Sequence, residues 1–534
     1  MRIVLFGGTV VDPTGMRRAD VAVDGDTIAE VGHVVARSDD HIIDCRGRFV
    51  LPGFVDAHSH ADGLLADDDV QRSLLKQGVT SVITGQDGVS YAPGDGAYAS
   101  DYFAAINGAH PTYSGGGVAE LLAAVDGRSR LNAAYLVPAG TVRWEVCGRS
   151  SAPARPAQRE AMASLVEQGM RDGAVGLSTG LDYVPGIFAD ADEIAALCEP
   201  VARAGGVYVT HMRGGYESNS AARVEEIVRI ARVCGVAIHV SHFHADAPIV
   251  LEQLDVLHRA GIDATFDAYP YIRGCTLLAM PLLPPELRLL PPDTVVDTIN
   301  EPAERIRLRR DWFPKVAQNA SLGPDWPAMI ALAHIAAPEL SWAHGLTVAD
   351  AAAQAGTDAI DFVLDVLAAS RLQVNAVMAV RHERPVEELA RIFAHPEHMG
   401  GSDGIFIGAH PHPRSRGTFA RYLREYVRET GTWSWPDAAQ HLAASPASRF
   451  ALGRRGEVAP GWVADLIVVD PLTFSDTASY EEPMQDAVGI DDVLVAGIPV
   501  LAGGVLSACT PGRGLRRENV ALRERVAQRS RAEG

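Results

Sequence analysis

The sequence predicts an α/β fold in which a closed (β/α)8 barrel is accompanied by a small β-sandwich domain built from both ends of the chain. Apolar strands alternate with helices through the centre of the chain, which indicates parallel βα units. Both ends of the chain instead show patterns typical of short strands joined by turns. The 534 residues suffice for one large domain and a smaller companion.

The two ends of the chain together predict the small β domain. Its N-terminal part, 1–52, contains Asp24-Gly25 between two apolar runs, which is a hairpin signal. Its C-terminal part, 453–512, contains a similar turn at Ala496-Gly497. The last segment, 513–534, is charged and favours helix, so we expect a helical tail there.

The length of the central part, 53–452, favours a closed barrel with insertions over a short open sheet, although periodicity alone fits either. Asp190, followed by Glu193, resembles a helix-capping pair, and the helix that it opens is expected to end at Gly205, before the strand Val207–His211. Helix and strand alternate in the same way as far as residue 270. A stretch dense in Pro and Trp, 281–351, predicts an insertion over the barrel mouth.

Composition restricts the partners and the compartment. Lys plus Arg number 47 and Asp plus Glu 67, so the net charge of −20 repels nucleic acid and anionic membranes. Six cysteines without a CxxC pair are expected to be reduced thiols. The start has no signal-like run, and no 18-residue apolar span occurs, so we expect a cytoplasmic protein that acts on a small molecule and could form a homo-oligomer.

Four histidines follow or end predicted barrel strands. His58 and His60 are two residues apart, so in a strand both rings lie on one face and can reach one metal ion. His211 and His242 end two later strands, and Asp403 follows another. Because barrel enzymes place their chemistry at the carboxyl ends of the strands, we expect these residues to converge on one rim, where the carboxylate could bind metal and accept a proton.

These motifs carry a family resemblance over nearly the whole chain. The sequence resembles the amidohydrolase superfamily and, within it, the N-acyl-D-amino-acid deacylases (D-aminoacylases). The superfamily is marked by the His-x-His motif, and the deacylase branch by segments 176–185 and 410–419. The resemblance implies a TIM-like barrel with a metal site at its C-terminal rim and cleavage of the amide of an N-acyl amino acid, of D configuration.

The resemblance also assigns roles to individual residues. One or two Zn²⁺ ions would be held by the four histidines, with Asp403 as ligand and general base. Hydroxide formed on zinc would attack the amide carbonyl, because zinc lowers the pKa of bound water to about 7. Arg414 would clamp the substrate carboxylate through its bidentate fork. Tyr183 could donate its hydroxyl to that carboxylate or to the oxyanion. Tyr269 and Tyr271, which strand-like alternation puts on one face, are weaker substrate candidates.

The chain departs from the deacylase pattern in three places. Asp87, in Gly85-Gln-Asp-Gly88, replaces a cysteine, and it could bridge two metals, hold one, or cap a turn. His244 replaces a lysine that helps to hold the substrate carboxylate in the family, so a weaker hold is expected near neutral pH. Pro138-Ala139 replaces a Gly-His pair.

Two alternative functions remain open from the sequence. The same site could hydrolyse or close a cyclic amide or imide, as hydantoinases and dihydroorotases do. The barrel could also be catalytically silent and serve as a binding subunit, since fold does not by itself imply function.

Overall fold

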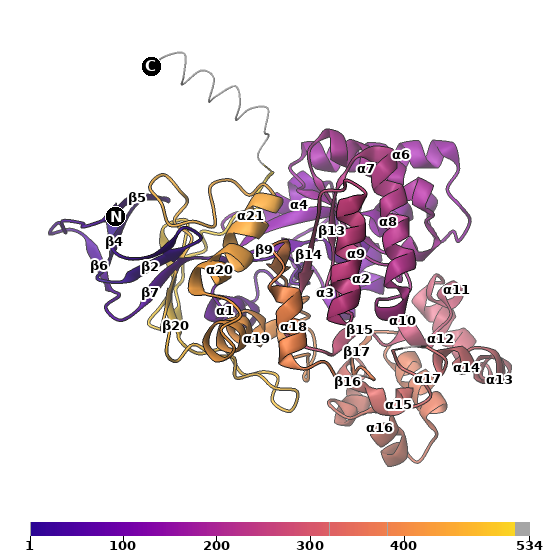
Figure 1. Cartoon of the computed structure of the whole chain (residues 1–534). Helices are drawn as coiled ribbons and strands as arrows, with labels where there is room; N and C mark the ends of the chain where they lie inside the picture. The colour runs from indigo at the N-terminus through magenta and orange to yellow at the C-terminus, as the bar shows by residue number, and fades with distance from the viewer. Residues whose placement is uncertain (1, 320, 382, 518–534) are drawn as a thin grey trace.

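The structure is a computed structural model that describes residues 2–319, 321–381 and 383–517. Three parts are visible in Figure 1: a β domain at the left, a barrel in the middle, and a mostly helical unit at the lower right. The β domain combines the indigo N-terminal strands with yellow strands from the C-terminal part of the chain, as expected from the sequence.

The central sheet is a barrel of eight parallel strands that follow one another in chain order. They are β8 (Phe54–Asp56), β9 (Val79–Thr84), β10 (Asn132–Pro138), β11 (Gly176–Gly180), β12 (Val207–His211), β13 (Ala237–Val240), β14 (Ala264–Ala268) and β18 (His398–Gly400). The circle is completed where the Ala57 amide donates to the Gly400 carbonyl at 3.1 Å. The predicted (β/α)8 fold is confirmed.

Helices cover the outside of the barrel, and α6 to α9 lie side by side over its strands in Figure 1. The outer helices include α1 (Asp68–Lys76), α4 (Val118–Val125), α5 (Ala139–Cys147), α6 (Pro156–Arg171), α7 (Ala191–Arg203), α8 (Ser220–Cys234), α9 (Ala247–Arg259), α18 (Val386–Phe393) and α19 (Arg414–Arg421). As predicted, Asp190 caps α7 by accepting a hydrogen bond from the Glu193 amide at 2.7 Å. The barrel strands are buried because helices cover their outer face and their own inward-facing side chains fill the barrel interior.

Shorter helical segments join these elements. They are η1 (Gln86–Gly88), α2 (Ala97–Tyr102), α3 (Ala104–Asn107), η2 (Gly186–Phe188), η3 (Glu217–Asn219), the π-helical η5 (Tyr422–Glu429), α20 (Trp435–Ala439), the π-helical η6 (Gln440–Ala444) and α21 (Ser445–Arg449). Several of them follow barrel strands, so their residues line the barrel mouth.

The β domain contains two sheets. The smaller is ordered β5 (Thr27–Gly32), β4 (Asp20–Asp24), β1 (Arg2–Phe6), β6 (His41–Asp44). The larger is ordered β22 (Val505–Leu506), β21 (Ile498–Ala502), β20 (Ile490–Val495), β19 (Leu466–Val469), β7 (Phe49–Pro52), β2 (Thr9–Asp12), β3 (Gly15–Arg18). The two ends of the chain meet where β19 pairs antiparallel with β7, and Ile3, Val21, Val50 and Leu466 belong to one apolar core.

The helical unit lies between β14 and β18 in the chain. A three-stranded antiparallel sheet, β15 (Gly274–Leu277), β17 (Val374–Met378) and β16 (Ile330–Ile335), joins it to the barrel side. Its helices are α10 (Ala279–Leu282), α11 (Pro285–Arg288), α12 (Pro292–Asn300), α13 (Pro302–Asp311), α14 (Phe313–Val316), α15 (Trp326–Met329), η4 (Pro338–Ala343), α16 (Val348–Ala355) and α17 (Ala359–Ala369). Its own apolar core runs from Leu278 to Ala376, so the unit extends beyond the predicted insertion 281–351 on both sides.

Only the beginning of the predicted helical tail, 513–534, lies within the described residues. There the prediction is wrong, because residues 513–517 are not helical: Gly514 forms a parallel bridge with Ala133 of β10. The Leu515 amide donates to the Ala133 carbonyl at 2.7 Å, so this segment is extended along the barrel strand. Residues 518–534 lie outside the described residues.

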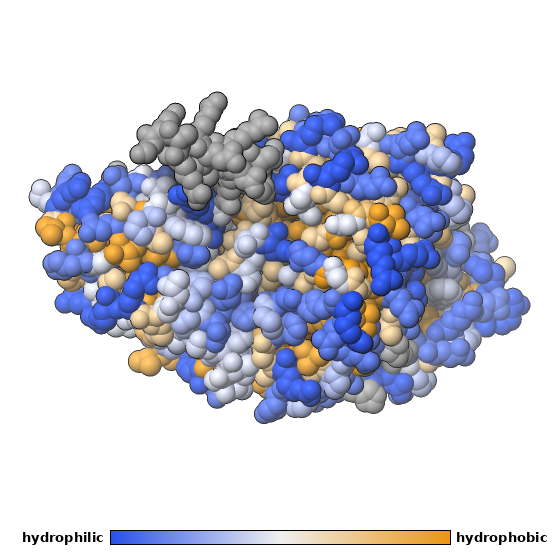
Figure 2. Space-filling model, turned by 45° about the horizontal axis from the view of Figure 1, so that its top comes forward, coloured by the Kyte–Doolittle hydropathy of each residue, from blue (hydrophilic) through white to orange (hydrophobic). Residues whose placement is uncertain are grey.

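The surface shown in Figure 2 mixes hydrophilic residues with small hydrophobic patches, several of them over the β domain at the left. Exposed apolar side chains of that domain include Phe6, Val35 and Val505. Among the described residues, none of the helices has the length and apolar character that a membrane span requires.

Candidate metal centre and active site

Six candidate metal-binding side chains meet at the carboxyl ends of the barrel strands. His58 and His60 follow β8, Asp87 lies in η1 after β9, and His211 ends β12. His242 and Asp403 follow β13 and β18. All six are buried, so the parallel barrel brings distant parts of the chain to one rim, as the sequence predicts.

Asp87 is shared by two groups of potential ligands. One group joins it to His58 and His60, the other to His211 and His242, and within each group the ligand atoms lie within 4.8 Å of one another. Oδ1 of Asp87 is 3.7 Å from His58 Nε2 and 3.8 Å from His242 Nε2. Oδ2 is 3.7 Å from His60 Nε2 and 3.6 Å from His211 Nδ1.

These separations fit ligands that share a cation. Two ligand atoms that each lie about 2.1 Å from a tetrahedral zinc ion are about 3.4 Å from each other, close to the distances observed here. The distances are too long for direct hydrogen bonds. Both His58 Nε2 and Asp87 Oδ1 are buried without a hydrogen-bond partner among the described residues. Imidazole nitrogens with carboxylate oxygens are a donor set suited to zinc.

Three of the six residues have an unusual backbone conformation. Asp87, His242 and Asp403 have φ values of 56°, 32° and 48°, in the region that side chains other than glycine rarely adopt. Each such residue costs on the order of 1–3 kcal/mol, and such strain gathers at functional sites. The turns after β9, β13 and β18 therefore hold these side chains inward at some cost in stability.

A second layer of polar groups orients the imidazoles. Asp267 Oδ2, on β14, is 3.4 Å from His58 Nδ1, and Asp182 Oδ2 is 3.2 Å from His211 Nε2. Asn107 Oδ1 is 3.0 Å from His60 Nδ1. Such partners fix which ring nitrogen faces a metal. None of the three was predicted from the sequence, although Asp267 lies near the end of β14 and Asp182 just after β11, as the predicted histidines lie at the ends of other strands.

The buried carboxylates and imidazoles of the cluster stabilise one another's charged forms. Burial opposes protonation of His58, but the carboxylates of Asp267, Asp403 and Asp87 outweigh it and raise the His58 pKa to about 9. Burial works in the same sense at His211, where Asp87 and Asp182 raise the pKa to about 10. Burial would raise the pKa of Asp87, but His211, His242 and His58 hold it well below its usual value. A bound cation would take over the role of these protons.

A cavity of about 410 Å³ opens over the cluster. Asp87, His211, His242 and Asp403 line it on the barrel side. Its other walls mix aromatic, apolar and basic residues from the barrel loops and the helical unit, among them Tyr183, Ile187, His244, Tyr269, Ile272, Met280, Trp312, Leu322, Met378 and Arg384. A pocket that combines a few converging polar groups with apolar walls is suited to a small organic substrate.

The candidate substrate residues occupy different places. Tyr183 lines the cavity, and its hydroxyl is 2.8 Å from Thr276 Oγ1. Tyr269 also lines it, and its ring lies tilted against the His244 ring at a centroid distance of 4.1 Å. Tyr271 is not among the lining residues, because its ring packs under the Arg421 guanidinium at 4.5 Å. Strand-like alternation over 269–271 thus fails to predict a shared face, because β14 ends at Ala268.

His244 is buried and held by the backbone. Its Nε2 lies 2.9 Å from the Tyr271 carbonyl. Burial and the charge of Arg384 lower the pKa of His244 to about 3. The side chain is therefore uncharged near neutral pH, which agrees with the weaker hold on a carboxylate that replacing a lysine predicts.

Arg414 contacts Asp403 directly. Its Nη2 is 2.9 Å from Asp403 Oδ2, and its guanidinium lies 4.6 Å from the Tyr269 ring centroid. Burial would raise the pKa of Asp403, but Arg414 and His242 hold it well below its usual range. Arg414 is fully buried behind the cavity wall, and its Nε and Nη1 have no partner among the described residues.

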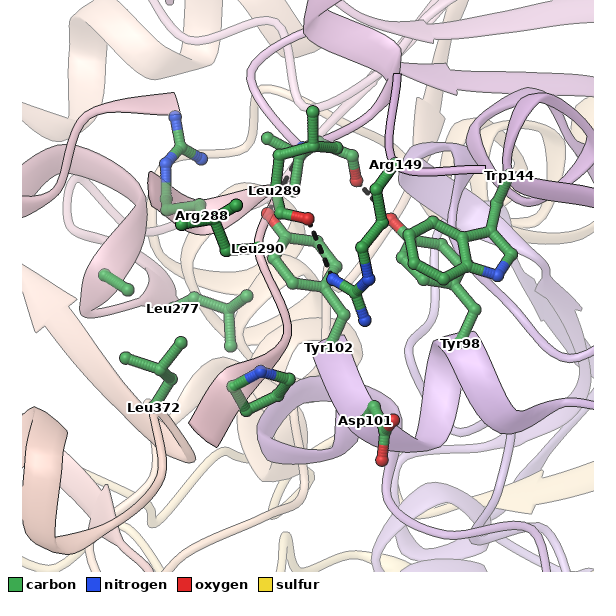
Figure 3. A pocket seen from close by; sticks show the side chains of 13 residues that line it. Tyr98, Asp101, Tyr102, Trp144, Arg149, Leu277, Arg288, Leu289, Leu290 and Leu372 are labelled. Carbon is green, nitrogen blue, oxygen red and sulfur yellow. Dashed lines mark hydrogen bonds between the residues drawn. The ribbon is translucent and has the colours of Figure 1, made fainter. Parts of the chain in front are cut away.

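The helical unit is joined to the site through Arg288 and Asp182. Arg288 Nη1 donates to the Asp182 carbonyl at 3.1 Å, next to the carboxylate that orients His211. Figure 3 shows the neighbouring junction, where Leu289 and Leu290 face Tyr98 and Tyr102 of the barrel side. There Arg149 Nη1 donates to the Leu289 carbonyl at 2.8 Å. The unit that walls the cavity is therefore held by specific contacts.

Comparison with known proteins identifies the family. The sequence profile of the amidohydrolase family matches residues 41–271 and 324–501. The chain belongs to the amidohydrolase family. This amidohydrolase is 32% identical to D-aminoacylase from Alcaligenes xylosoxydans xylosoxydans, over 96% of this chain and 97% of the relative. It is also 32% identical to the N-acyl-D-glutamate deacylase of that organism, over 97% and 96% of the two chains.

Solved structures agree. The crystal structure of a D-aminoacylase matches this amidohydrolase with a TM-score of 0.79 and 29% identity, covering 96% of this chain and 99% of the other. N-acyl-D-glutamate deacylase from Bordetella bronchiseptica, complexed with zinc and a phosphonate inhibitor, matches with a TM-score of 0.80 and 31% identity, again over 96% and 99%. The predicted resemblance to the D-aminoacylases is confirmed.

Proposed function

We propose that this amidohydrolase removes the acyl group from an N-acyl-D-amino acid, with zinc held by His58, His60, Asp87, His211 and His242. The observation that carries the proposal is the carboxylate of Asp87, shared by two histidine pairs at the floor of a substrate-sized cavity. The deacylase relatives that span nearly the whole chain, one of them solved with zinc, support it.

Bound zinc would lower the pKa of water to about 7 and polarise the substrate carbonyl. Asp403 lines the cavity and is kept ionised, so it is placed to accept a proton from the attacking water. As the water oxygen bonds to the carbonyl carbon, the C–N bond breaks, and Asp403 returns the proton to the departing nitrogen. The products are a carboxylic acid and a free amino acid.

Asp87 is proposed as the shared ligand of the site. A carboxylate is a harder ligand than a thiolate and binds zinc less tightly, but its two oxygens can serve two ions. Each Asp87 oxygen lies near one histidine of the pair His58–His60 and one of the pair His211–His242. A study of D-aminoacylase describes its binuclear centre in terms of one-metal activation and second-metal attenuation. We therefore propose that this chain also binds one or two ions.

Substrate contacts are proposed from the cavity wall. The Tyr183 hydroxyl is placed to donate to the substrate, and Tyr269 supplies an aromatic face. The predicted clamp of Arg414 on the substrate carboxylate does not fit its place behind the cavity wall, and Arg414 is proposed instead to keep Asp403 ionised through their ion pair. The lining residues, as far as the structure describes them, include no lysine, which favours the deacylase over the lysine-bridged hydantoinase reaction.

A substrate panel on the purified protein tests the proposal. We expect hydrolysis of N-acetyl-D-amino acids with bound zinc, and little or none of L isomers, hydantoin or dihydroorotate. The His60→Ala variant should lose zinc and activity, whereas the matched control His33→Ala, at an exposed position of the β domain, should keep both. Turnover confined to the cyclic compounds, or wild-type activity in the zinc-free protein, would contradict it.

A further inference from the structure

We propose that Arg384 binds a carboxylate of the substrate inside the cavity. The inference rests on the proposed function and adds to it the residue that selects anionic substrates. Arg384 lies between β17 and α18, where the chain leaves the helical unit and returns to the barrel. It lines the same cavity as Asp87, His211 and Asp403.

Arg384 is buried without the partners that a buried charge normally has. The residue is only 7% exposed, and both Nε and Nη1 of its side chain lack a hydrogen-bond partner among the described residues. Burying a guanidinium without compensation is costly, and an arginine remains charged at any pH at which proteins fold. An anion that enters the cavity would therefore find a desolvated, permanently positive group.

Other buried arginines of the molecule are paired. Arg143 forms an ion pair with Glu193, and Arg416 with Asp69 and Asp486. Arg288, which shares the cavity wall, donates to the carbonyls of Leu283 and Asp182. Arg384 thus differs from these arginines: it lines the cavity and forms no ion pair with a carboxylate of the described residues.

The charges of the cavity favour one orientation of the ligand. At the metal end the carboxylates of Asp87 and Asp182 lie beside histidines that offset their charge, whereas Arg384 is a positive group left unpaired within the described part of the chain. Apolar wall is supplied by Ile272, Met280, Trp312 and Met378. A carboxylate matches the planar fork of a guanidinium. An N-acyl amino acid therefore fits with its amide at the metal end and its carboxylate at Arg384.

The test compares charged substrates with neutral isosteres. Arg384→Met should lower kcat/KM for N-acetyl-D-leucine about 10- to 100-fold, the range that corresponds to a charge-assisted hydrogen bond, and leave N-acetyl-D-leucinamide within about 3-fold. Arg384→Lys should recover part of the loss. The matched control Arg381→Met, at an exposed position three residues earlier, should change neither.

A second substrate pair identifies which carboxylate is bound. If Arg384 holds the α-carboxylate, N-acetyl-D-glutamate and N-acetyl-D-glutamine will lose activity equally. If it holds a side-chain carboxylate, only N-acetyl-D-glutamate will lose it. The first result supports the orientation described above, and the second shows that Arg384 binds a side-chain carboxylate instead, in which case N-acetyl-D-leucine keeps its activity in Arg384→Met. Equal losses for N-acetyl-D-leucine and its amide, together with no difference between the second pair, would overturn it.

Binding measurements separate this inference from the proposed function. Calorimetric titration of the zinc-loaded Asp403→Asn protein with N-acetyl-D-leucine and with its amide needs no turnover. Adding Arg384→Met to the Asp403→Asn protein should weaken the binding of the carboxylate but not that of the amide. This result is expected even if the wild type hydrolyses neither compound. No binding of the carboxylate, or equal weakening of both ligands, would overturn the inference. The melting temperature of Arg384→Met checks folding, and it should not fall, because an unpaired buried charge has been removed.

Discussion

Asp87 Oδ2 lies 3.6 Å from His211 Nδ1, although Asp87 follows β9 and His211 ends β12. The same carboxylate reaches His58 and His60, so one side chain connects the first barrel strand with the strands that follow. Asp87 is held there by a left-handed turn with φ of 56°. The arrangement gives an anionic side chain the central position among four imidazoles.

Removing the shared carboxylate should release metal. We expect Asp87→Ala to retain about half or less of the wild-type zinc, because both ligand groups lose a member. Asp87→Cys should bind zinc at least as tightly as the wild type, since sulfur is the softer ligand. Metal content per chain, measured on protein dialysed against metal-free buffer, checks both, with Asp24→Ala in an exposed hairpin as the control. Full zinc content in Asp87→Ala would contradict the shared-ligand assignment.

Asp403→Asn should abolish proton transfer while leaving the fold intact. The amide cannot act as a base, so kcat should fall about 10²- to 10⁴-fold on N-acetyl-D-amino acids. Because Asn cannot pair ionically with Arg414, some loss of stability is also expected. Steady-state kinetics with a parallel melting curve separates the two effects. Unchanged kcat in a folded, zinc-loaded variant would remove Asp403 from the mechanism.

Asp267 is expected to act through the histidines that it touches. Its carboxylate lies near His58 and His239 and accepts a hydrogen bond from the His242 amide at 2.9 Å. Asp267→Asn should therefore weaken zinc binding about 10- to 100-fold, as loss of outer partners does in other metal sites. Competition with a chelator measures this change. Asp263→Asn, just before the same strand and exposed, should bind zinc like the wild type.

The buried ion pair of Arg143 with Glu193 should contribute to stability only as a pair. Both side chains are almost fully buried, on α5 and α7. Arg143→Met leaves an unpaired buried carboxylate and should cost about 3–5 kcal/mol in the free energy of unfolding. Adding Glu193→Gln to that variant should restore part of the loss. Denaturant unfolding of the two single variants and the double variant gives the coupling, and additive losses would show that the contact is unimportant.

The sequence could predict the parts that follow from local pattern. Strand-end histidines such as His211 and the Asp190 cap depend on near neighbours, and the structure has both where they were expected. Asp267, Asp182 and Asn107 were missed because their role depends on which strands become neighbours in space. Tyr271 does not share a face with Tyr269, because β14 ends at Ala268 and strand-like alternation does not continue to residue 271. Arg384 could not be singled out, since only burial without a partner distinguishes it from other arginines.

Residues 513–517, the described part of the predicted helical tail, are not helical for a related reason. Charged, helix-favouring composition is a weak local preference, and the edge of β10 offers residues 513–515 backbone hydrogen bonds instead. Tertiary pairing thus decides the conformation of this segment where local propensity does not.

The most direct test of the account is a crystal structure of the zinc-loaded protein with anomalous scattering recorded on both sides of the zinc edge. We predict an anomalous peak about 2.0–2.2 Å from an Asp87 oxygen and from histidine nitrogens of at least one of the pairs His58–His60 and His211–His242. A second peak at the other pair would show two ions. Peaks only elsewhere in the molecule, in protein that retains deacylase activity, would contradict the central claim.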